Sequence, residues 1–249
     1  MAERQMTLTD HLNELRHRLL AVLAVFIVSA VVMLCFTKKL YLWMTRDLGI
    51  QHLAVLSPGD IVWIYFVLAG VLAIAVTLPF AAWQLWRFVE PALTPRERKF
   101  TLSYIPAVFL LFVAGIAFGY FVVFPNIFRF LLSMNQGMFR VVFTVDRYFH
   151  FMLNIVLPFG FLFELPVVVV FLTNLGIVTP ARMRKWRRVA YFVLIILGVV
   201  LSPPDFVSDT VMSVPLILLY EICVALCAFT WRRKMRRRMA EGEEGSVGS

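Results

Sequence analysis

The sequence predicts an all-α polytopic membrane protein with six transmembrane helices, both termini in the cytoplasm and a short fifth helix. Of its 249 residues, 61% are hydrophobic and 16% are charged, and the mean hydropathy is +0.84. A soluble domain of this length is far less apolar. Lipid is therefore the expected solvent for most of the chain.

Six apolar runs are the expected transmembrane helices, because one bilayer crossing needs about 20 mostly apolar residues. The runs are 19–37, 61–86, 100–124, 149–175, 189–202 and 210–231. The fifth would form only about 21 Å of helix, against a hydrocarbon core of about 30 Å. We expect the bilayer to be thinner beside it. In the sixth run, Pro215 predicts a kink or a late helix start.

The orientation follows from the basic residues in alternate connections between these runs. One side carries 18 of the 24 Lys and Arg residues, in 1–18, 87–99, 177–188 and 232–249. The other side carries 6, and the basic side faces the cytoplasm. This pattern predicts a multi-pass protein of the cytoplasmic (inner) membrane.

We expect three parts along the chain. Residues 1–18 form an amphipathic helix on the membrane surface, residues 19–231 form the membrane domain, and residues 232–249 form a cytoplasmic tail. The tail is basic at first and is expected to be disordered from Glu241 onward. Its arginines favour contact with anionic lipids. No soluble domain presents a basic surface, so nucleic-acid binding is not expected.

Glu164 is the most informative single residue. It lies in 153–175, a stretch otherwise without charge, and a carboxylate at bilayer depth costs at least about 2.5 kcal/mol. It either faces a pocket that receives a partner or cargo, or is a satisfied polar group with a packing role. Glu221 in the sixth run is a weaker candidate, because it could reach the cytoplasmic interface by snorkelling.

Two further glutamates are expected at the cytoplasmic interface. Glu14 precedes Arg18 by four residues, the spacing of a helical ion pair worth a few tenths of a kcal/mol. Glu97 completes a capping box with Thr94, and Pro95 takes the first helical position. Each glutamate thus has a structural explanation. Two carboxylates close together on this face could also bind a basic peptide.

Four segments carry a resemblance to a known family. They are HLNELRHRLL at 11–20, WRFVEPAL at 86–93 followed by RER at 96–98, GFLFELP at 160–166, and LSPPD at 201–205. In this order and spacing they resemble the signature segments of TatC, the multispanning receptor of the twin-arginine protein translocase. The resemblance implies binding of twin-arginine signal peptides, assembly with TatA-type and TatB-type single-span subunits, self-association, and export of folded proteins driven by the proton-motive force.

The resemblance also implies roles for particular residues. Glu14 and Glu97 would contact the paired arginines, and Arg16 and Arg18 would orient these carboxylates. Phe88 would pack against the apolar part of the signal, although a plain interfacial aromatic explains it equally well. A partner-binding region would include Glu164, Ser202, Asp205 and Asp209. Asp209 departs from the family pattern, because many relatives carry glutamine there.

Other functions are less well supported by the sequence. An intramembrane enzyme would need a nucleophile with a base, or a cluster of acids or histidines, and no such pattern occurs. A proton-coupled small-solute transporter is the stronger alternative, because Glu164 is the kind of residue that proton coupling uses. That fold would show internal repeats, and none is evident. We expect no metal and no cofactor.

Overall fold

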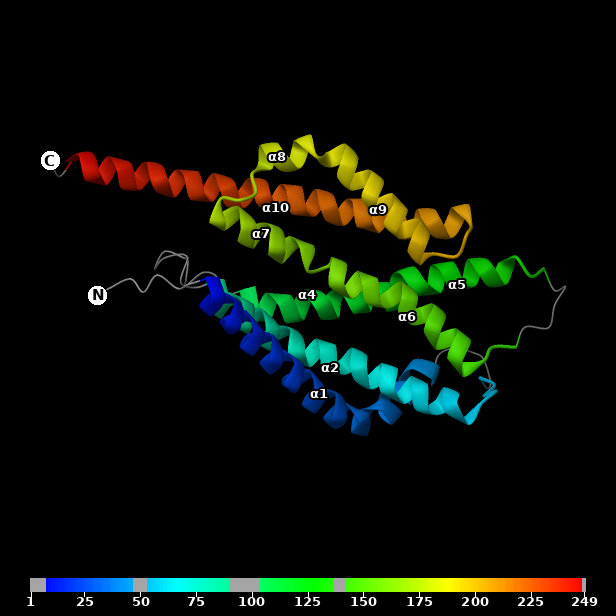
Figure 1. Ribbon diagram of the computed structural model, residues 1–249. Helices are drawn as coiled ribbons and strands as arrows, with labels where there is room; N and C mark the ends of the chain where they lie inside the picture. Colours follow the sequence, from blue (N-terminus) through cyan, green and yellow to red (C-terminus); the bar gives the residue numbers. More distant parts are fainter. Residues whose placement is uncertain (1–7, 47–52, 90–103, 137–141, 248–249) are drawn as a thin grey trace. The chain divides into compact units, whose positions relative to one another are not determined.

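The computed structural model describes residues 8–46, 53–89, 104–136 and 142–247, with side chains over 13–45, 53–88, 105–136 and 142–236. Within these ranges the fold is helical (Figure 1), and Ala54 and Thr144 form one isolated β-bridge. Five described helices are long and apolar enough to cross a membrane: Asn13–Thr45, Pro58–Phe88, Ile105–Ser133, Val145–Leu175 and Phe206–Arg236. The all-α membrane fold is confirmed. A sixth crossing and the orientation stay predictions.

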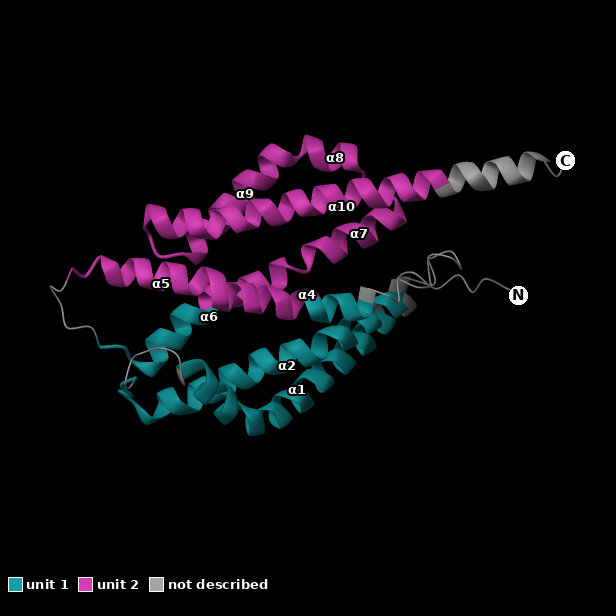
Figure 2. Cartoon of the chain, turned by 180° about the vertical axis from the view of Figure 1, so that it is seen from behind, with its two compact units in different colours: residues 1–110, 140–153 teal, residues 111–139, 154–249 magenta. Residues whose placement is uncertain are grey.

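The chain divides into two compact units, which are described separately (Figure 2). The first comprises residues 1–110 and 140–153. In it, α1 (Leu8–Arg46) packs along α2 (Pro58–Val89), and the unit also contains the starts of α4 (Tyr104–Phe118) and α6 (Val145–Leu162). The α2 face that points inward repeats at helical spacing and contains Ile64, Leu68, Ala69 and Ala73.

Helix α1 is longer than the sequence predicted. It runs without a break from the expected surface helix through the first apolar run and ends at Arg46. The sequence analysis ended the first apolar run at residue 37, which left Lys38 and Lys39 in the connection that follows, and that boundary was wrong. The helix continues because both lysines remain exposed while Thr37 and Met44, on another face, are buried.

In the first unit, backbone hydrogen bonds join the segment before α2 to the segment that leads into α6. The Ala54 N–H donates to the Phe143 carbonyl at 2.8 Å, and the Val145 N–H donates to the Ala54 carbonyl at 2.9 Å. Near the start of each helix, the rings of Trp63 (α2) and His150 (α6) stack with centroids 4.1 Å apart. These contacts join the start of α2 to the start of α6.

The second unit comprises residues 111–139 and 154–249. In it, α4 passes through a π-helical turn (Gly119–Val123) into α5 (Phe124–Ser133), so this helix extends beyond the predicted end at 124. Gly115 and Gly119 lie against α6, where a Cβ on Gly115 would overlap the Phe159 carbonyl oxygen and lie 2.9 Å from the Gly160 Cα. Small residues allow this close approach of the two backbones.

Helix α6 is followed by α7 (Leu165–Leu175), α8 (Pro180–Lys185), α9 (Arg187–Leu201) and α10 (Phe206–Val247). The short fifth helix predicted at 189–202 is α9, whose 15 residues span about 22 Å. Pro215 predicted a kink or a late helix start; α10 begins at Phe206 and runs through Pro215, so the late start was wrong and a kink stays a prediction. It continues to Val247, so the disorder that the composition predicted from Glu241 was wrong up to that residue; the three glutamates of 241–247 are good helix formers.

Candidate functional site

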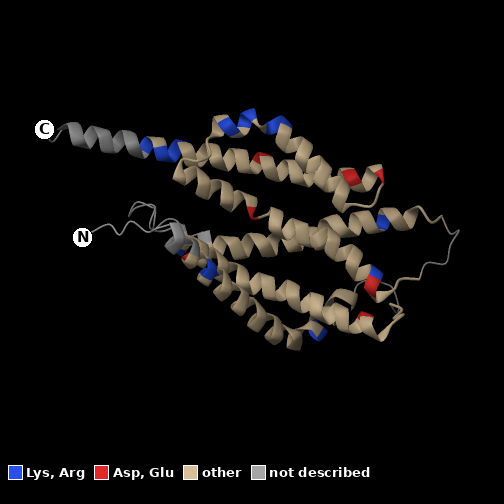
Figure 3. Cartoon of the chain, viewed as in Figure 1, with Lys and Arg blue, Asp and Glu red and all other residues tan. Residues whose placement is uncertain are grey.

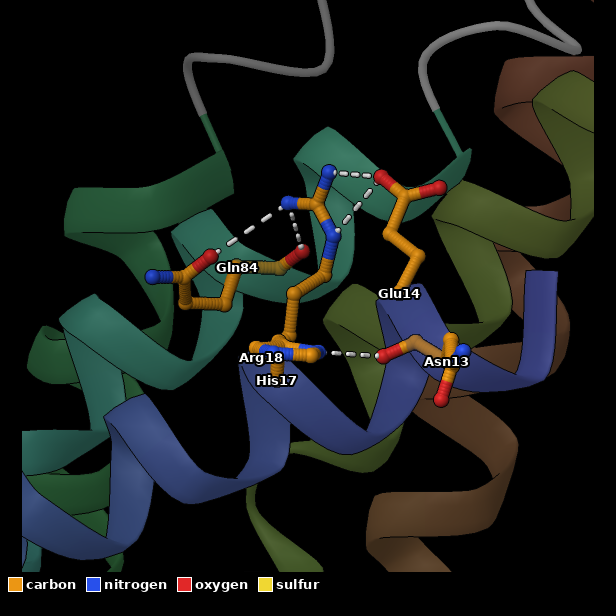
Figure 4. Close-up of polar contacts among 5 residues, drawn as sticks. All are labelled: Asn13, Glu14, His17, Arg18 and Gln84. Carbon is orange, nitrogen blue, oxygen red and sulfur yellow. Dashed lines mark hydrogen bonds and ion pairs between the residues drawn. The ribbon is translucent and has the colours of Figure 1, made fainter. Parts of the chain in front are cut away.

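Glu14 on α1 forms the centre of a polar cluster with α2 (Figure 4). The Arg18 guanidinium donates from Nε to Glu14 Oε1 at 3.1 Å and also from Nη2 to the same oxygen. Arg18 Nη1 in turn donates to both the carbonyl and the side-chain oxygen of Gln84, each at 3.3 Å. The predicted helical ion pair is therefore formed, and Gln84 fixes its arginine to the neighbouring helix.

The Glu14 carboxylate remains accessible within this cluster. Its side chain is 27% exposed and that of Arg18 is 18% exposed. Every hydrogen bond recorded for this carboxylate among the described residues goes to Oε1, so Oε2 has no partner there. Phe88 lies one helical turn beyond Gln84, near the end of α2, and is half-buried.

The structure does not place the other two charged residues of the predicted peptide site, Arg16 and Glu97, in the Glu14 cluster. Arg16 is exposed, and among the described residues it makes no hydrogen bond or ion pair with Glu14. Glu97 and its capping box lie outside the described residues, as does the loop that carries them. The structure therefore brings Glu14, Arg18 and Gln84 together and does not place Glu97.

Glu164 lies at a break between two helices. It is the N-cap of α7, and its side chain makes no capping hydrogen bond. The Glu164 N–H donates to the Phe161 carbonyl at 3.1 Å, while Pro166 has no N–H to donate to the Leu162 carbonyl. Its Oε1 atom is buried and has no hydrogen-bond partner among the described residues. The break thus concentrates unsatisfied acceptors inside a predicted membrane span.

A second polar group lies between α9 and α10. The Ser202 hydroxyl donates to Asp209 Oδ1 at 2.5 Å, and Asp205 Oδ1 accepts the Ser208 N–H at 2.7 Å. Asp205 is therefore the N-cap of α10, and it satisfies one of the helix's free N–H groups. Asp205 Oδ2 and the fully buried Ser208 Oγ have no partner among the described residues.

The Glu221 carboxylate accepts hydrogen bonds from side chains of α9, so it does not depend on snorkelling to the membrane interface. Arg187 Nη2 donates to Glu221 Oε2 at 2.6 Å, and the Tyr191 hydroxyl donates to Glu221 Oε1. The Tyr220 hydroxyl also donates to the Met183 carbonyl at 2.9 Å, which joins α10 to α8. These contacts explain Glu221 as a structural residue of the second unit.

Comparison with known proteins identifies the family. A family model described as "Sec-independent protein translocase protein (TatC)" matches residues 10–215. The chain belongs to the TatC family. It is 50% identical over 240 residues to the Sec-independent protein translocase protein TatCd of Bacillus subtilis (strain 168), which covers 96% of this chain and 99% of that relative. It is 37% identical to TatCy of the same organism, over 99% of this chain and 98% of that one.

A solved structure of the TatC family has the same fold. The crystal structure described as the twin-arginine translocase receptor TatC matches with a TM-score of 0.77 at 30% identity, covering 88% of this chain and 99% of that one. As a TatC protein, this chain is a component of the Sec-independent protein translocase in the membrane and not an enzyme. The family assignment also disfavours the solute-transporter alternative suggested by Glu164.

Some of these site residues were not predicted from the sequence. Gln84 is the lone amide in the run 61–86, and this isolation is a signal that could have singled it out. Tyr191 carries no comparable signal, because tyrosine is common at membrane interfaces. Its partner Glu221 lies 30 residues away, so helix spacing cannot predict the contact.

Proposed function

We propose that this TatC protein receives twin-arginine signal peptides, and that the Glu14 end of α1 binds the arginine pair. In this proposal both termini face the cytoplasm, and TatA-type and TatB-type subunits assemble with the chain. The complex exports folded proteins across the cytoplasmic membrane using the proton-motive force. The observation that carries the proposal is a half-buried carboxylate, held in place by Arg18, with one oxygen left without a described partner.

The geometry at Glu14 suits a second guanidinium. A carboxylate offers about four lone-pair sites, and Arg18 engages only Oε1. Because Gln84 anchors Arg18, the carboxylate is presented in a fixed orientation before the peptide arrives. At 4 Å and an effective dielectric near 20, a second guanidinium gains about 4 kcal/mol from this carboxylate, less the cost of desolvation and the repulsion from Arg18.

This arrangement also favours arginine over lysine. Guanidinium offers a planar fork of donors that matches a carboxylate, whereas an ammonium is a point charge and cannot reproduce the paired hydrogen bonds. Glu97 supplies the second carboxylate in this proposal, on the strength of the motif RER at 96–98. Phe88, one turn beyond Gln84, would contact the peptide beside the arginine pair.

Site-specific photo-crosslinking from position 88 tests the proposal. A precursor with paired arginines should crosslink, and its twin-lysine form should crosslink at least about tenfold less, the equivalent of 1.4 kcal/mol. Glu14→Gln and Glu97→Gln should each lower the twin-arginine signal to a similar extent. Asp146→Asn, which removes a carboxylate at the start of α6, is the control and should change nothing. Equal crosslinking of the two precursors would refute the assignment.

The proposal also gives Glu164 a role as a docking group for a single-span partner or the passing cargo. Its buried, unpaired Oε1 atom and the helix break beside it support this role. Glu164→Ala should reduce partner crosslinking and export. Glu164→Gln, which keeps a hydrogen-bonding group of the same size, should reduce them less. Wild-type levels in the alanine variant would exclude the role.

Ser202 and Asp209 are proposed as a second docking group, near the turn between α9 and α10. Their hydrogen bond of 2.5 Å leaves Asp209 as an acceptor, so a partner that meets it must offer a donor. Asp209→Asn should therefore alter which single-span partner crosslinks at this turn. Unchanged partner choice would argue against the assignment.

The orientation is supported by the charges of the second unit. Most of its basic residues gather on α8, the start of α9 and the neighbouring part of α10, with Arg129 on α5 as an exception, whereas Asp205 and Asp209 lie at the opposite end of α9 and α10 (Figure 3). By the positive-inside rule the basic end faces the cytoplasm. A cysteine introduced at Arg236 should react with an impermeant reagent only in inverted membrane vesicles. Reaction in right-side-out vesicles would reverse the orientation.

A further inference from the structure

Two cationic side chains are bound to the turn that ends α7. The Lys234 ammonium on α10 donates to the Asn174 carbonyl, and Arg182 Nη1 on α8 donates to the Ile177 carbonyl at 2.6 Å. The two acceptor residues are three positions apart, so their Cα atoms lie within about 11 Å of each other. Cations are favoured there because the last carbonyls of a helix carry a partial negative charge. The end of α7 therefore holds two positive charges on a single turn.

The backbone between the two bound carbonyls is open to a ligand. Gly176 is exposed, and among the described residues a Cβ placed on it would have only Lys234 Nζ, at 3.9 Å, within 4 Å beyond its own chain neighbours. Ile177 is 54% exposed, and Arg182 is exposed as well. The Arg182 guanidinium has five N–H donors, and the Ile177 carbonyl takes one of them. Donors of Arg182 therefore remain for an anion that approaches Gly176.

The segments around this turn carry basic residues and no acidic ones. Residues 174–188 and 222–236 contain nine Lys or Arg residues and no Asp or Glu. Glu221, which precedes the second segment, is already bound by Arg187 and Tyr191. These segments therefore offer Arg182 and Lys234 no carboxylate, and like charges on one turn repel each other. An anion from outside the chain would relieve this repulsion.

The turn lies where two candidate membrane spans end. The span Val145–Leu175 ends next to Asn174, and the span Phe206–Arg236 ends two residues after Lys234. Trp186, which follows α8, is 58% exposed, and tryptophan is enriched at the level of the lipid head groups. The two cations are therefore expected at the level where the phosphates of the bilayer lie.

We infer that the turn at 174–177, with Arg182 and Lys234, binds the phosphate head group of an acidic phospholipid whose acyl chains remain in the surrounding bilayer. This site goes beyond the proposed function, because it needs neither a signal peptide nor a particular orientation of the chain. The general attraction of basic segments to anionic lipids depends on charge alone, whereas this site depends on two donors fixed by the end of α7.

The same geometry favours an acidic phospholipid over other phosphates. A lipid is already confined to the membrane surface, so it gives up less translational freedom on binding than a soluble phosphate does. Phosphatidylethanolamine also carries a phosphate, but the two cations repel its ammonium group. Phosphatidylglycerol has no cationic group and is therefore the lipid of choice for a test.

Lipid capture from position 177 tests the site in vesicles that contain the full chain in equal parts of phosphatidylglycerol and phosphatidylethanolamine. Ile177 lies on the turn. Ile222 is equally exposed, at 52% against 54%, but lies about 18 Å from Lys234 along α10. A photoreactive residue at position 177 should label phosphatidylglycerol several times more than phosphatidylethanolamine. At position 222 the two lipids should be labelled equally.

Charge variants separate the two fixed donors from general attraction, with phosphatidylglycerol binding to the detergent-purified protein followed by native mass spectrometry. Arg182→Gln and Lys234→Gln should each lower the apparent affinity by about tenfold to a hundredfold, the worth of one hydrogen bond to a charged group. Arg232→Gln removes an exposed cation from the same stretch of α10 and should lower it by at most about fivefold. Arg182→Lys and Lys234→Arg keep the charges and should retain most of the affinity, which separates lost binding from lost folding.

Each contrary outcome has a distinct meaning. Equal labelling of the two lipids at position 177, or equal losses from all three glutamine variants, would overturn the site in favour of general attraction. Inorganic phosphate that binds as tightly as phosphatidylglycerol, with the same dependence on Arg182 and Lys234, would assign the turn to a soluble anion. Labelling of a protein at position 177 in native membranes, in place of phosphatidylglycerol, would assign it to an acidic partner.

Discussion

Because α4 and α6 pack closely at Gly115, adding one methyl group there should lower the stability of the protein markedly. In Gly115→Ala the new Cβ would overlap the Phe159 carbonyl oxygen and lie 2.9 Å from both Gly160 Cα and Phe163 Cβ. Two of these three atoms are backbone and cannot rotate away, so the helices must separate. Overpacking of this kind costs about 1–3 kcal/mol, and we expect the upper half of that range.

Gly70→Ala is the matched control, because a Cβ there would meet no atom within 4 Å. Alanine is favoured over glycine in a helix by about 0.8–1.0 kcal/mol, so this variant should be more stable than the wild type. For a chain of this size, 1 kcal/mol corresponds to about 2–4 °C in Tm. Gly115→Ala gains the same helix propensity, so its net cost is about 1–2 kcal/mol and its Tm should fall by roughly 2–8 °C, whereas Gly70→Ala should raise Tm by about 2–4 °C.

Thermal unfolding of the detergent-purified protein, followed by tryptophan fluorescence, measures both shifts. Gly198→Ala provides an intermediate case, since its nearest neighbour is the Ser213 hydroxyl at 2.5 Å, a side chain that can rotate. The expected order of stability is Gly70→Ala, wild type, Gly198→Ala, Gly115→Ala. Equal Tm values for the Gly115 and Gly70 variants would show that the close approach of α4 and α6 is not formed in the protein.

Three further variants test separate contacts. Arg187→Ala should destabilise the second unit by about 1 kcal/mol because it leaves the Glu221 carboxylate with fewer partners. In a double-mutant cycle, the Tm shifts of the Arg187 and Glu221 variants should not add up in the double variant. Additive shifts would contradict the Arg187–Glu221 ion pair. His150→Ala removes the ring stacked on Trp63 and should cost about 0.5–1.5 kcal/mol, visible as a changed tryptophan emission spectrum, and an unchanged spectrum would count against the stack. Asp205→Ala removes the N-cap of α10 and should cost about 0.5–2 kcal/mol, so faster amide exchange in the first turn of α10 is expected, and unchanged exchange would reject the cap.

Most of the helices could be predicted from hydropathy alone, because each apolar run has no alternative to a helix in lipid. The ends of the helices could not be predicted in this way. The first apolar run was ended before Lys38 and Lys39, yet an exposed lysine does not end a helix whose other face is buried. Pro215 indicated a kink or a late start, but a proline within α10 removes one donor and leaves the preceding turns free to form.

The site was predicted only in its local part. Glu14 and Arg18 are four residues apart on one helix, so their ion pair follows from helix geometry. Gln84 joins this pair from 66 residues away, and the contact depends on how α1 and α2 pack. The break at Glu164 was missed as well, although the proline two residues later explains it once the chain is seen to bend there.

Lys234 has a consequence for shortened forms of this chain. It donates to the Asn174 carbonyl at the end of α7, beside Gly176, whose φ of +83° closes that helix. The first turns beyond Trp231 therefore complete the fold of an element some sixty residues earlier and are not a detachable appendage. A chain cut before Lys234 would lose this bond between α10 and the end of α7, whereas a cut after Arg236 would retain it.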